Sequence, residues 1–252
     1  MPRFFVRADQ IEGGRITLTG EDALHISRSL RMREGEEITV CDMRRREYRC
    51  RLAGFTAETV ECEILETSES ESEPPYALTL YMALPKSDKM EWIIQKSVEL
   101  GVTRIVPVRT ERCIVKLDSK EGEKKRQRWQ KIADNAAGQC GRGILPEVAA
   151  PMDFADAVAE GGAAGLPLFC YEAEEKTENA LPRLLRATDP AAVGSIAVLV
   201  GAEGGFSVKE AESAVAAGWR SVTLGKRILR CETAPLFVLS AVSCALEVGR
   251  KE

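Results

Sequence analysis

Two glycine-rich segments in the last quarter of the chain carry residue types suited to binding a small molecule. The first, residues 198–207, reads VLVGAEGGFS, and the second, residues 224–234, reads LGKRILRCETA. Each follows an apolar strand-like run and precedes a helix-like run, which is where α/β proteins bind ligands. Glycines without a Cβ let backbone N–H groups approach a ligand closely. We therefore expect the two segments to form one ligand pocket.

The first segment also has a purely structural interpretation. Ser207 and Glu210 have the spacing of a capping box, so the glycines could simply form a tight turn before a helix. That pair explains the helix start but does not require three glycines before it, which favours ligand contact. The segment is not the dinucleotide fingerprint GxGxxG, and it lacks the GK[ST] ending of a P-loop.

Two charged residues in these segments are candidates for chemistry. Arg230 directly follows the apolar pair 228–229, and a guanidinium can stabilise developing negative charge although it cannot act as a base at neutral pH. Glu203 is a possible proton acceptor, or else a loop carboxylate bonded to a backbone N–H or to an arginine. Core packing is the alternative to ligand contact for Leu224, Ile228 and Leu229.

Strand-like and helix-like runs alternate from residue 78 onward. This alternation predicts an α/β fold, with a mostly parallel sheet covered by helices on both faces. The predicted strands are 78–83, 104–108, 168–171, 196–201 and 221–224, and the predicted helices are 89–100, 123–140, 154–159, 208–217 and 235–248.

The N-terminal part has a different pattern, of short β-like runs separated by turn residues. These runs predict a small barrel or sandwich with one helical interruption at 21–30. Residues 66–75 are polar, acidic and closed by two prolines, so we expect a linker there. The predicted domains are 1–73 and 74–252. The predicted strands of the first domain are 3–7, 15–19, 37–41, 47–53 and 59–65.

Composition narrows the class of protein. The 252 residues are 44% hydrophobic and 29% charged, as in an ordinary soluble globular protein. We expect a cytoplasmic protein, because no signal-peptide pattern and no membrane-length apolar run occur. The eight cysteines are scattered without a CxxC pair, which favours reduced thiols. His25 is the single histidine, and we predict no metal site.

The formal net charge of −4 argues against a protein that binds nucleic acid over its whole surface, so local basic clusters are more informative than the total charge. One cluster contains Arg28, Arg31 and Arg33. A second contains the run 44–46, which we interpret as a solvated surface. Phosphate contacts by arginines supply salt-dependent affinity for RNA.

The two glycine segments together resemble the signature of the knotted, SPOUT-type RNA methyltransferases, and within that superfamily they are most similar to the bacterial RsmE family. This family methylates N3 of a uridine, uridine 1498, in 16S ribosomal RNA of the small subunit. It usually has proline where this chain has Ala202. Further matching strings are residues 2–6, 25–31, 95–102, 110–112 and 128–129, and Gln139 with Arg142 and Pro146.

The resemblance implies a PUA-like RNA-binding β-barrel in residues 1–73 and a methyltransferase domain with a deep trefoil knot in residues 74–252. It also implies a homodimer through the C-terminal domain and S-adenosylmethionine (SAM) as the methyl donor. The implied SAM-binding residues are Leu199, Gly201, Gly204, Gly205, Leu224, Gly225, Ile228, Leu229 and Ala234. The implied RNA-binding residues are Arg3, Arg7, Arg28, Arg31, Gln139 and Arg142, and Arg230 and Glu203 are the candidate catalytic residues.

Two alternatives remain open at this level. One is a knotted methyltransferase that acts on another base or on a ribose 2′-OH, which requires no removal of the N3 proton. The other is a non-catalytic RNA-binding assembly factor. The presence of the glycines together with Arg230 argues against the second alternative.

Overall fold

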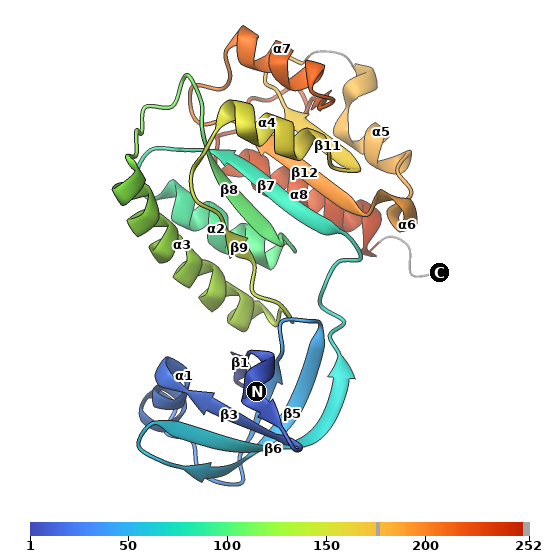
Figure 1. The fold of residues 1–252 in the computed structure, drawn as a ribbon. Helices are drawn as coiled ribbons and strands as arrows, with labels where there is room; N and C mark the ends of the chain where they lie inside the picture. Colours follow the sequence, from blue (N-terminus) through green and yellow to red (C-terminus); the bar gives the residue numbers. More distant parts are fainter. Residues whose placement is uncertain (175–176, 249–252) are drawn as a thin grey trace. The chain divides into compact units, whose positions relative to one another are not determined.

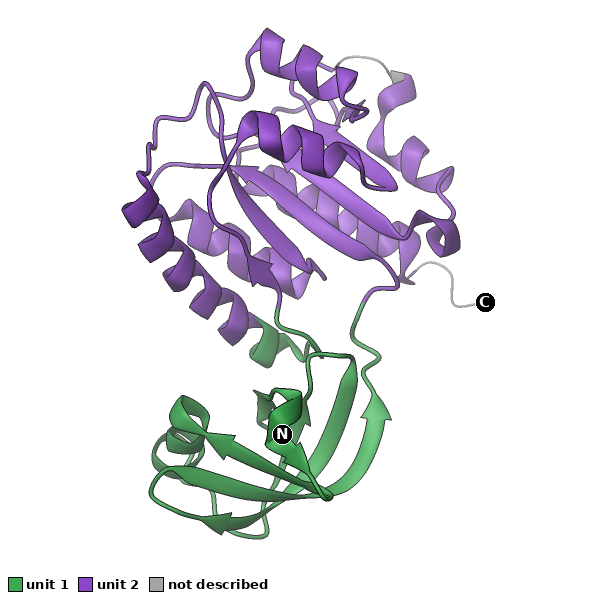
Figure 2. Ribbon diagram, in the orientation of Figure 1, with its two compact units in different colours: residues 1–73, 137–145 green, residues 74–136, 146–252 purple. Residues whose placement is uncertain are grey.

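The chain folds into two compact units (Figures 1 and 2). The computed structural model describes residues 1–174 and 177–248. The first unit contains residues 1–73 and 137–145, and the second contains residues 74–136 and 146–252. The sequence placed the boundary at the same residue, 73, but it gave no sign that residues 137–145 return to the first unit.

The first unit is built on a six-stranded sheet of order β1-β4-β5-β6-β3-β2. Its strand pairs are antiparallel, except that β1 and β4 are parallel. Side chains alternate between the two faces of each strand, so Ile16 and Leu18 of β3 are fully buried while their neighbours are exposed. The strands are β1 (Arg3–Phe5), β2 (Ile11–Glu12), β3 (Arg15–Thr19), β4 (Glu37–Cys41), β5 (Arg46–Phe55) and β6 (Thr59–Glu69).

Short helical turns interrupt this sheet. The 3₁₀ turn η1 (Ala8–Gln10) precedes β2, and the helix α1 (Gly20–Leu24) continues into a π-helical turn, η2 (His25–Ser29). Arg31, just beyond η2, has a left-handed backbone with φ +54°. The predicted single helix at 21–30 is therefore two different helical turns, and π turns often occur at functional positions.

Strand β6 extends through part of the predicted linker. Glu66 pairs with Arg49 of β5 in the sheet register, and the Arg49 guanidinium donates to Glu66 Oε2 at 3.0 Å and to Glu37 Oε2 at 3.2 Å. Residues 66–69 are polar and mostly exposed, so this part of the strand has no hydrophobic alternation that would reveal it. The linker prediction was wrong for these residues.

The second unit is an all-parallel sheet of order β10-β8-β7-β12-β11-β13, with β9 also paired to β8. The central strands are buried on both faces, as in other parallel sheets. The strands are β7 (Ala77–Ala83), β8 (Arg104–Arg109), β9 (Glu147–Val148), β10 (Met152–Asp153), β11 (Leu166–Cys170), β12 (Ser195–Val200) and β13 (Arg220–Val222).

Helices cover both faces of this sheet, as the alternating pattern predicts. In Figure 1, α4 (Phe154–Gly162) and α7 (Val208–Ala216) lie on one face, and α2 (Lys89–Glu99) and α8 (Thr233–Leu246) lie on the other. The remaining helical elements are α3 (Ser119–Cys140), η3 (Thr177–Asn179), α5 (Leu181–Arg186) and α6 (Pro190–Val193), of which the last three were not predicted. None of the helices in the described residues is long and apolar enough to cross a membrane.

Candidate functional site

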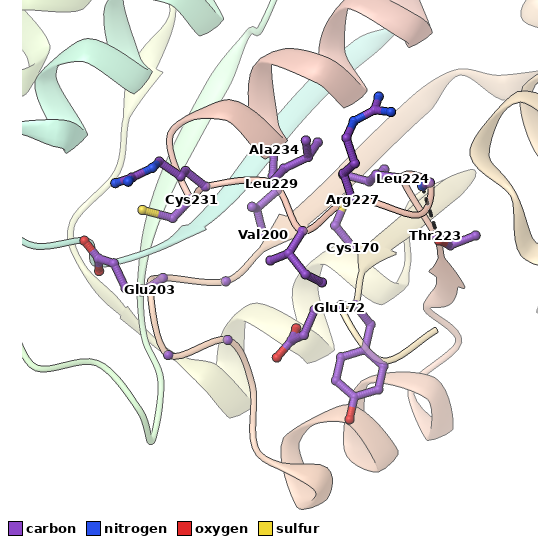
Figure 3. A pocket seen from close by; sticks show the side chains of 18 of the residues that line it. Cys170, Glu172, Val200, Glu203, Thr223, Leu224, Arg227, Leu229, Cys231 and Ala234 are labelled. Atoms are coloured by element: carbon purple, nitrogen blue, oxygen red, sulfur yellow. Dashed lines mark hydrogen bonds between the residues drawn. The ribbon is translucent and has the colours of Figure 1, made fainter. Parts of the chain in front are cut away.

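A cavity of about 400 Å³ lies at the carboxyl ends of the neighbouring strands β12, β11 and β13. The loops after these strands and the start of α8 form its walls (Figure 3). Parallel α/β sheets bind ligands at this edge, and the volume is typical of small-molecule sites. The lining residues are Lys89, Cys170, Tyr171, Glu172, Val200, Gly201, Ala202, Glu203, Gly204, Gly205, Thr223, Leu224, Gly225, Arg227, Ile228, Leu229, Arg230, Cys231 and Ala234.

The cavity brings together the two glycine segments. The predicted SAM-binding residues that line it are Gly201, Gly204, Gly205, Leu224, Gly225, Ile228, Leu229 and Ala234. Leu199 does not line it. Its side chain is fully buried in the core of the second unit, because β12 is covered on both faces, and Val200 at the strand end lines the cavity instead.

Neighbouring protein atoms explain the glycines of the first loop. A Cβ on Gly201 would lie 3.0 Å from the Phe206 ring, and a Cβ on Gly204 would lie 3.0 Å from Cβ of Arg112. Gly205 has φ +61°, and a Cβ there would collide with the carboxylate of Glu172. The sequence suggested that the glycines make room for a ligand. In the structure, they let the loop pack closely on its neighbours, which holds its backbone beside the cavity.

The second loop has a different reason for its glycine. Gly225 has φ +114°, and a Cβ there would meet open space, so the backbone conformation alone favours glycine. Further along the same loop, Ile228 lines the cavity while 80% of its surface is exposed. Leu229 is partly buried beside it. Part of the Leu229 side chain is thus packed against the protein, whereas the Ile228 side chain offers exposed apolar surface to a ligand.

Two arginines line the cavity from this second loop. The carbonyl oxygen of Arg230 accepts the N–H groups of Thr233 at 2.8 Å and Ala234 at 2.9 Å, which fixes its backbone against the start of α8. The side chains of Arg227 and Arg230 are exposed, and neither makes an ion pair or a hydrogen bond with another described residue. Both guanidinium groups are therefore available to a ligand.

Lys89, at the start of α2, joins both loops. Its Nζ lies 2.9 Å from Oε1 of Glu203 and 3.2 Å from Oε2 of Glu232, and the backbone N–H of Lys86 donates to Glu203 at 3.3 Å. Burial acts to raise the pKa of Glu203, but the hydrogen bonds from Lys89 and from backbone N–H groups, together with the charge of Lys89, outweigh it, and the pKa falls below its ordinary value. An ionised carboxylate held in this way is a poor proton acceptor near neutral pH.

In the first unit, four of the predicted RNA-binding residues remain at the surface. The side chains of Arg28 and Arg31 are exposed, next to the π turn, and make no ion pair with another described residue. Arg7 is exposed, with its Nε 3.2 Å from Oδ1 of Asp9. Gln139 is exposed near the end of α3.

The other two residues predicted to bind RNA, Arg142 and Arg3, are instead paired with carboxylates of the protein. Arg142 is only 3% exposed, and its guanidinium donates to Oε2 of Glu73 at 2.7 Å, so the prediction that it binds RNA was wrong. Arg3 donates from both terminal nitrogens to the carboxylate of Glu47, at 2.7 and 3.1 Å. Its side chain is largely buried, so it is a structural residue.

The side chain of His25 makes no hydrogen bond to the described residues. Its exposed ring instead meets Phe4 edge-on, with 6.2 Å between the ring centroids. All eight cysteines are free thiols. No group of three or more metal-ligating side chains occurs in residues 1–174 and 177–248.

Three charged residues of the cavity were not among the predicted site residues, namely Lys89, Glu172 and Arg227. Glu172 follows directly after a predicted strand, and polar residues at the carboxyl ends of parallel strands are candidates for ligand contact. That position was therefore a usable signal. Lys89 had none, because its partners Glu203 and Glu232 are more than a hundred residues away.

Two family models match this chain. Residues 72–243 match the RNA methyltransferase domain, and residues 18–65 match the RNA methyltransferase PUA domain. The first unit is thus PUA-like, and the all-parallel second unit carries the methyltransferase match.

Full-length relatives agree with these models. The ribosomal RNA small subunit methyltransferase E of Bacillus subtilis is 35% identical, over 99% of both chains. A crystal structure of the protein of that name from Neisseria gonorrhoeae, bound to SAM, is 34% identical with a TM-score of 0.82, covering 96% of this chain and 97% of that one. A methyltransferase structure from Legionella pneumophila, also holding SAM, is 32% identical with the same TM-score and coverage. This chain belongs to the ribosomal RNA small subunit methyltransferase E family.

Proposed function

We propose that this protein transfers a methyl group from SAM to N3 of a uridine in 16S ribosomal RNA, the family's target being uridine 1498. The observation that carries the proposal is one cavity that combines a rigid glycine loop, an apolar wall and an unpaired arginine. Relatives that share the fold over nearly their whole length hold SAM.

The cavity fits SAM in size and chemistry. Its volume of about 400 Å³ suits a ligand of this size. The side chains of Ile228 and Leu229 offer an apolar surface to the adenine ring, and the backbone of residues 201–205 offers polar groups. When bound, SAM supplies the methyl group as part of a positively charged sulfonium.

Arg230 is assigned the chemical role. The N3–H of uridine is a weak acid, and N3 needs a free electron pair to accept a methyl group, so negative charge develops on the uracil ring. The guanidinium of Arg230 can bond to a uracil carbonyl oxygen and stabilise that charge. Its backbone is fixed at the start of α8, which pre-organises the side chain for this contact.

Glu203 receives a supporting role in this mechanism. Its carboxylate already accepts hydrogen bonds from Lys89 and from the backbone of Lys86, and its pKa is lowered. Of the two roles that the sequence offered, the loop carboxylate agrees with these contacts, although the partner is a lysine and not an arginine. We therefore do not assign removal of the N3 proton to Glu203. In the proposed reaction this proton passes to water, the methyl group moves from the sulfonium to N3, and the donor leaves as S-adenosylhomocysteine.

The proposal extends to the architecture of the family. The second unit contains the trefoil knot, dimerises with a second copy and works in the cytoplasm on ribosomal RNA. The first unit grips the RNA through Arg28 and Arg31, whose exposed guanidinium groups are available to phosphates.

The contribution of Ile228 to the apolar wall of the cavity is tested by measuring SAM affinity. Ile228→Ala removes three methyl or methylene groups, each worth about 0.8 kcal/mol when fully buried, so SAM should bind up to about sixtyfold more weakly by calorimetry. Ile114→Ala is the matched control, because Ile114 is also highly exposed and does not line the cavity. Equal SAM affinity in both variants would remove Ile228 from the site.

The proposed contact between Arg31 and RNA phosphates is tested by the salt dependence of RNA affinity. Arg31→Ala should weaken RNA binding and flatten the plot of log affinity against log salt by about one phosphate contact, with SAM affinity unchanged. Arg44→Ala, a change at an exposed arginine of the other cluster, should leave the slope as it is. An unaltered slope in the Arg31 variant would show that Arg31 is merely solvated.

The function itself is tested by the modified nucleoside. Purified protein, SAM and small-subunit particles from cells that lack the enzyme should yield 3-methyluridine, identified by mass spectrometry of digested RNA. A 2′-O-methyl nucleoside or another methylated base would instead indicate a knotted methyltransferase that acts on a ribose or on a different base. SAM binding without any methylated product would indicate the other alternative, a non-catalytic RNA-binding assembly factor.

A further inference from the structure

The side chain of Glu172 occupies a distinctive position in the cavity. It lies in the loop after β11 and lines the cavity opposite the second glycine-rich loop (Figure 3). Its carboxylate lies so close to Cα of Gly205 that a Cβ on Gly205 would collide with it. The glycine loop thus accommodates a carboxylate at this point, beside the space that a ligand would fill.

The charges around the cavity single out this carboxylate. Lys89 lies between Glu203 and Glu232, so the charge of Glu203 is compensated within the protein. Glu172, in contrast, makes no hydrogen bond or ion pair with any described residue, although it is exposed to the cavity. Among the described residues that line the cavity, it is the acidic side chain without a cationic partner.

A ligand with a matching cation would complete this arrangement. SAM carries an ammonium and a sulfonium as cationic groups, and a carboxylate that the exposed side chain of Arg227 can meet. The ammonium has three N–H donors, and hydrogen bonds between an ammonium and a carboxylate are among the strong ones in proteins. The sulfonium has no such donor, and its methyl group has to face the RNA.

Building on the proposed function, we propose that Glu172 binds the α-ammonium group of the methyl donor and so selects ligands that carry an intact amino-acid moiety. In this arrangement, Glu172 holds the methionine part of SAM against the glycine loop. The apolar wall at Ile228 and Leu229 holds the adenine part.

A series of three ligands tests this proposal. SAM has the ammonium and the sulfonium, S-adenosylhomocysteine has the ammonium alone, and 5′-methylthioadenosine has neither but keeps the adenine and the ribose. Glu172→Gln removes the charge while keeping the shape. We expect it to weaken binding of the first two ligands by about tenfold or more by calorimetry, and to leave 5′-methylthioadenosine unchanged.

Each other pattern would overturn the assignment. An equal loss for all three ligands would place Glu172 at the ribose hydroxyls. A loss for SAM alone would place it at the sulfonium, and no loss for any ligand would show that it does not touch the donor. Glu212→Gln, on α7 and outside the cavity, is the matched control and should alter none of the affinities.

Wild-type binding separates this inference from the proposed function. If the unaltered protein fails to bind SAM, the proposed function fails with it. If the unaltered protein binds SAM and the Glu172→Gln variant binds each of the three ligands as tightly as the unaltered protein does, only the role of Glu172 is withdrawn. Thermal unfolding of the two variants, expected to match because both side chains are exposed, shows that neither change acts through the fold.

Discussion

Arg230→Ala is expected to slow single-turnover methylation by about a hundredfold or more, while SAM affinity changes by less than about twofold. The charge that the guanidinium meets on the uracil ring develops only during the reaction, so its loss affects turnover and not binding of the donor. Arg230→Lys should recover little of the rate, because an ammonium lacks the planar fork of the guanidinium.

Arg227→Ala is the matched control for this prediction. Arg227 also lines the cavity from the same loop with an exposed side chain, but its backbone is not fixed by the start of α8. We expect a much smaller loss of turnover in this variant. If Arg230→Ala weakens SAM binding and leaves single-turnover methylation unchanged, Arg230 is a ligand of the donor and its catalytic assignment is withdrawn.

Arg142→Met is expected to lower the free energy of unfolding by about 3–5 kcal/mol, as the loss of one partner from a buried ion pair does. The variant leaves the carboxylate of Glu73 without its cation, although the side chain of Glu73 is fully buried. Among the described residues, Glu73 would retain the N–H groups of Gly143, at 2.7 Å, and Ile144, at 3.3 Å, as its remaining partners. Denaturant unfolding, followed by circular dichroism, measures the change.

Two further variants make this result interpretable. Arg126→Ala breaks an exposed pair with Glu123 on α3 and should shift unfolding far less. The double change Glu73→Leu with Arg142→Met should recover much of the loss, because an apolar pair of similar size can replace a buried ion pair. An Arg142→Met variant no less stable than Arg126→Ala would contradict the structural role of the buried pair.

Local patterns could be predicted well from the sequence. The capping box of α7 forms as expected, with the N–H of Ser207 donating to Glu210 Oε2 at 2.9 Å and the N–H of Glu210 donating to Ser207 Oγ at 3.3 Å. The partners are three residues apart, so spacing alone determines the contact. Glu210 Oε1 also accepts the N–H of Glu111 at 2.8 Å. Nothing local indicates that second contact.

Long-range burial could not be predicted in the same way. Arg142 and Glu73 have the residue types of a solvated surface, and their contact joins positions 69 residues apart. Likewise, Glu66 belongs to a strand only because β5 places Arg49 opposite to it. The two glycine segments were easier, since the first follows the clearly apolar strand β12, the second follows the short strand β13, and the carboxyl ends of parallel strands share one edge of the sheet.

The chain crosses between its two compact units after residues 73, 136 and 145. The PUA-like unit is therefore not encoded by one contiguous stretch of the gene. A truncation after residue 73 would remove residues 137–145 and with them the cation that Glu73 needs. An exchange of gene fragments at a single junction would likewise combine one half of the buried pair with a foreign partner. The two halves of that unit therefore have to be inherited together, with the methyltransferase sequence that lies between them.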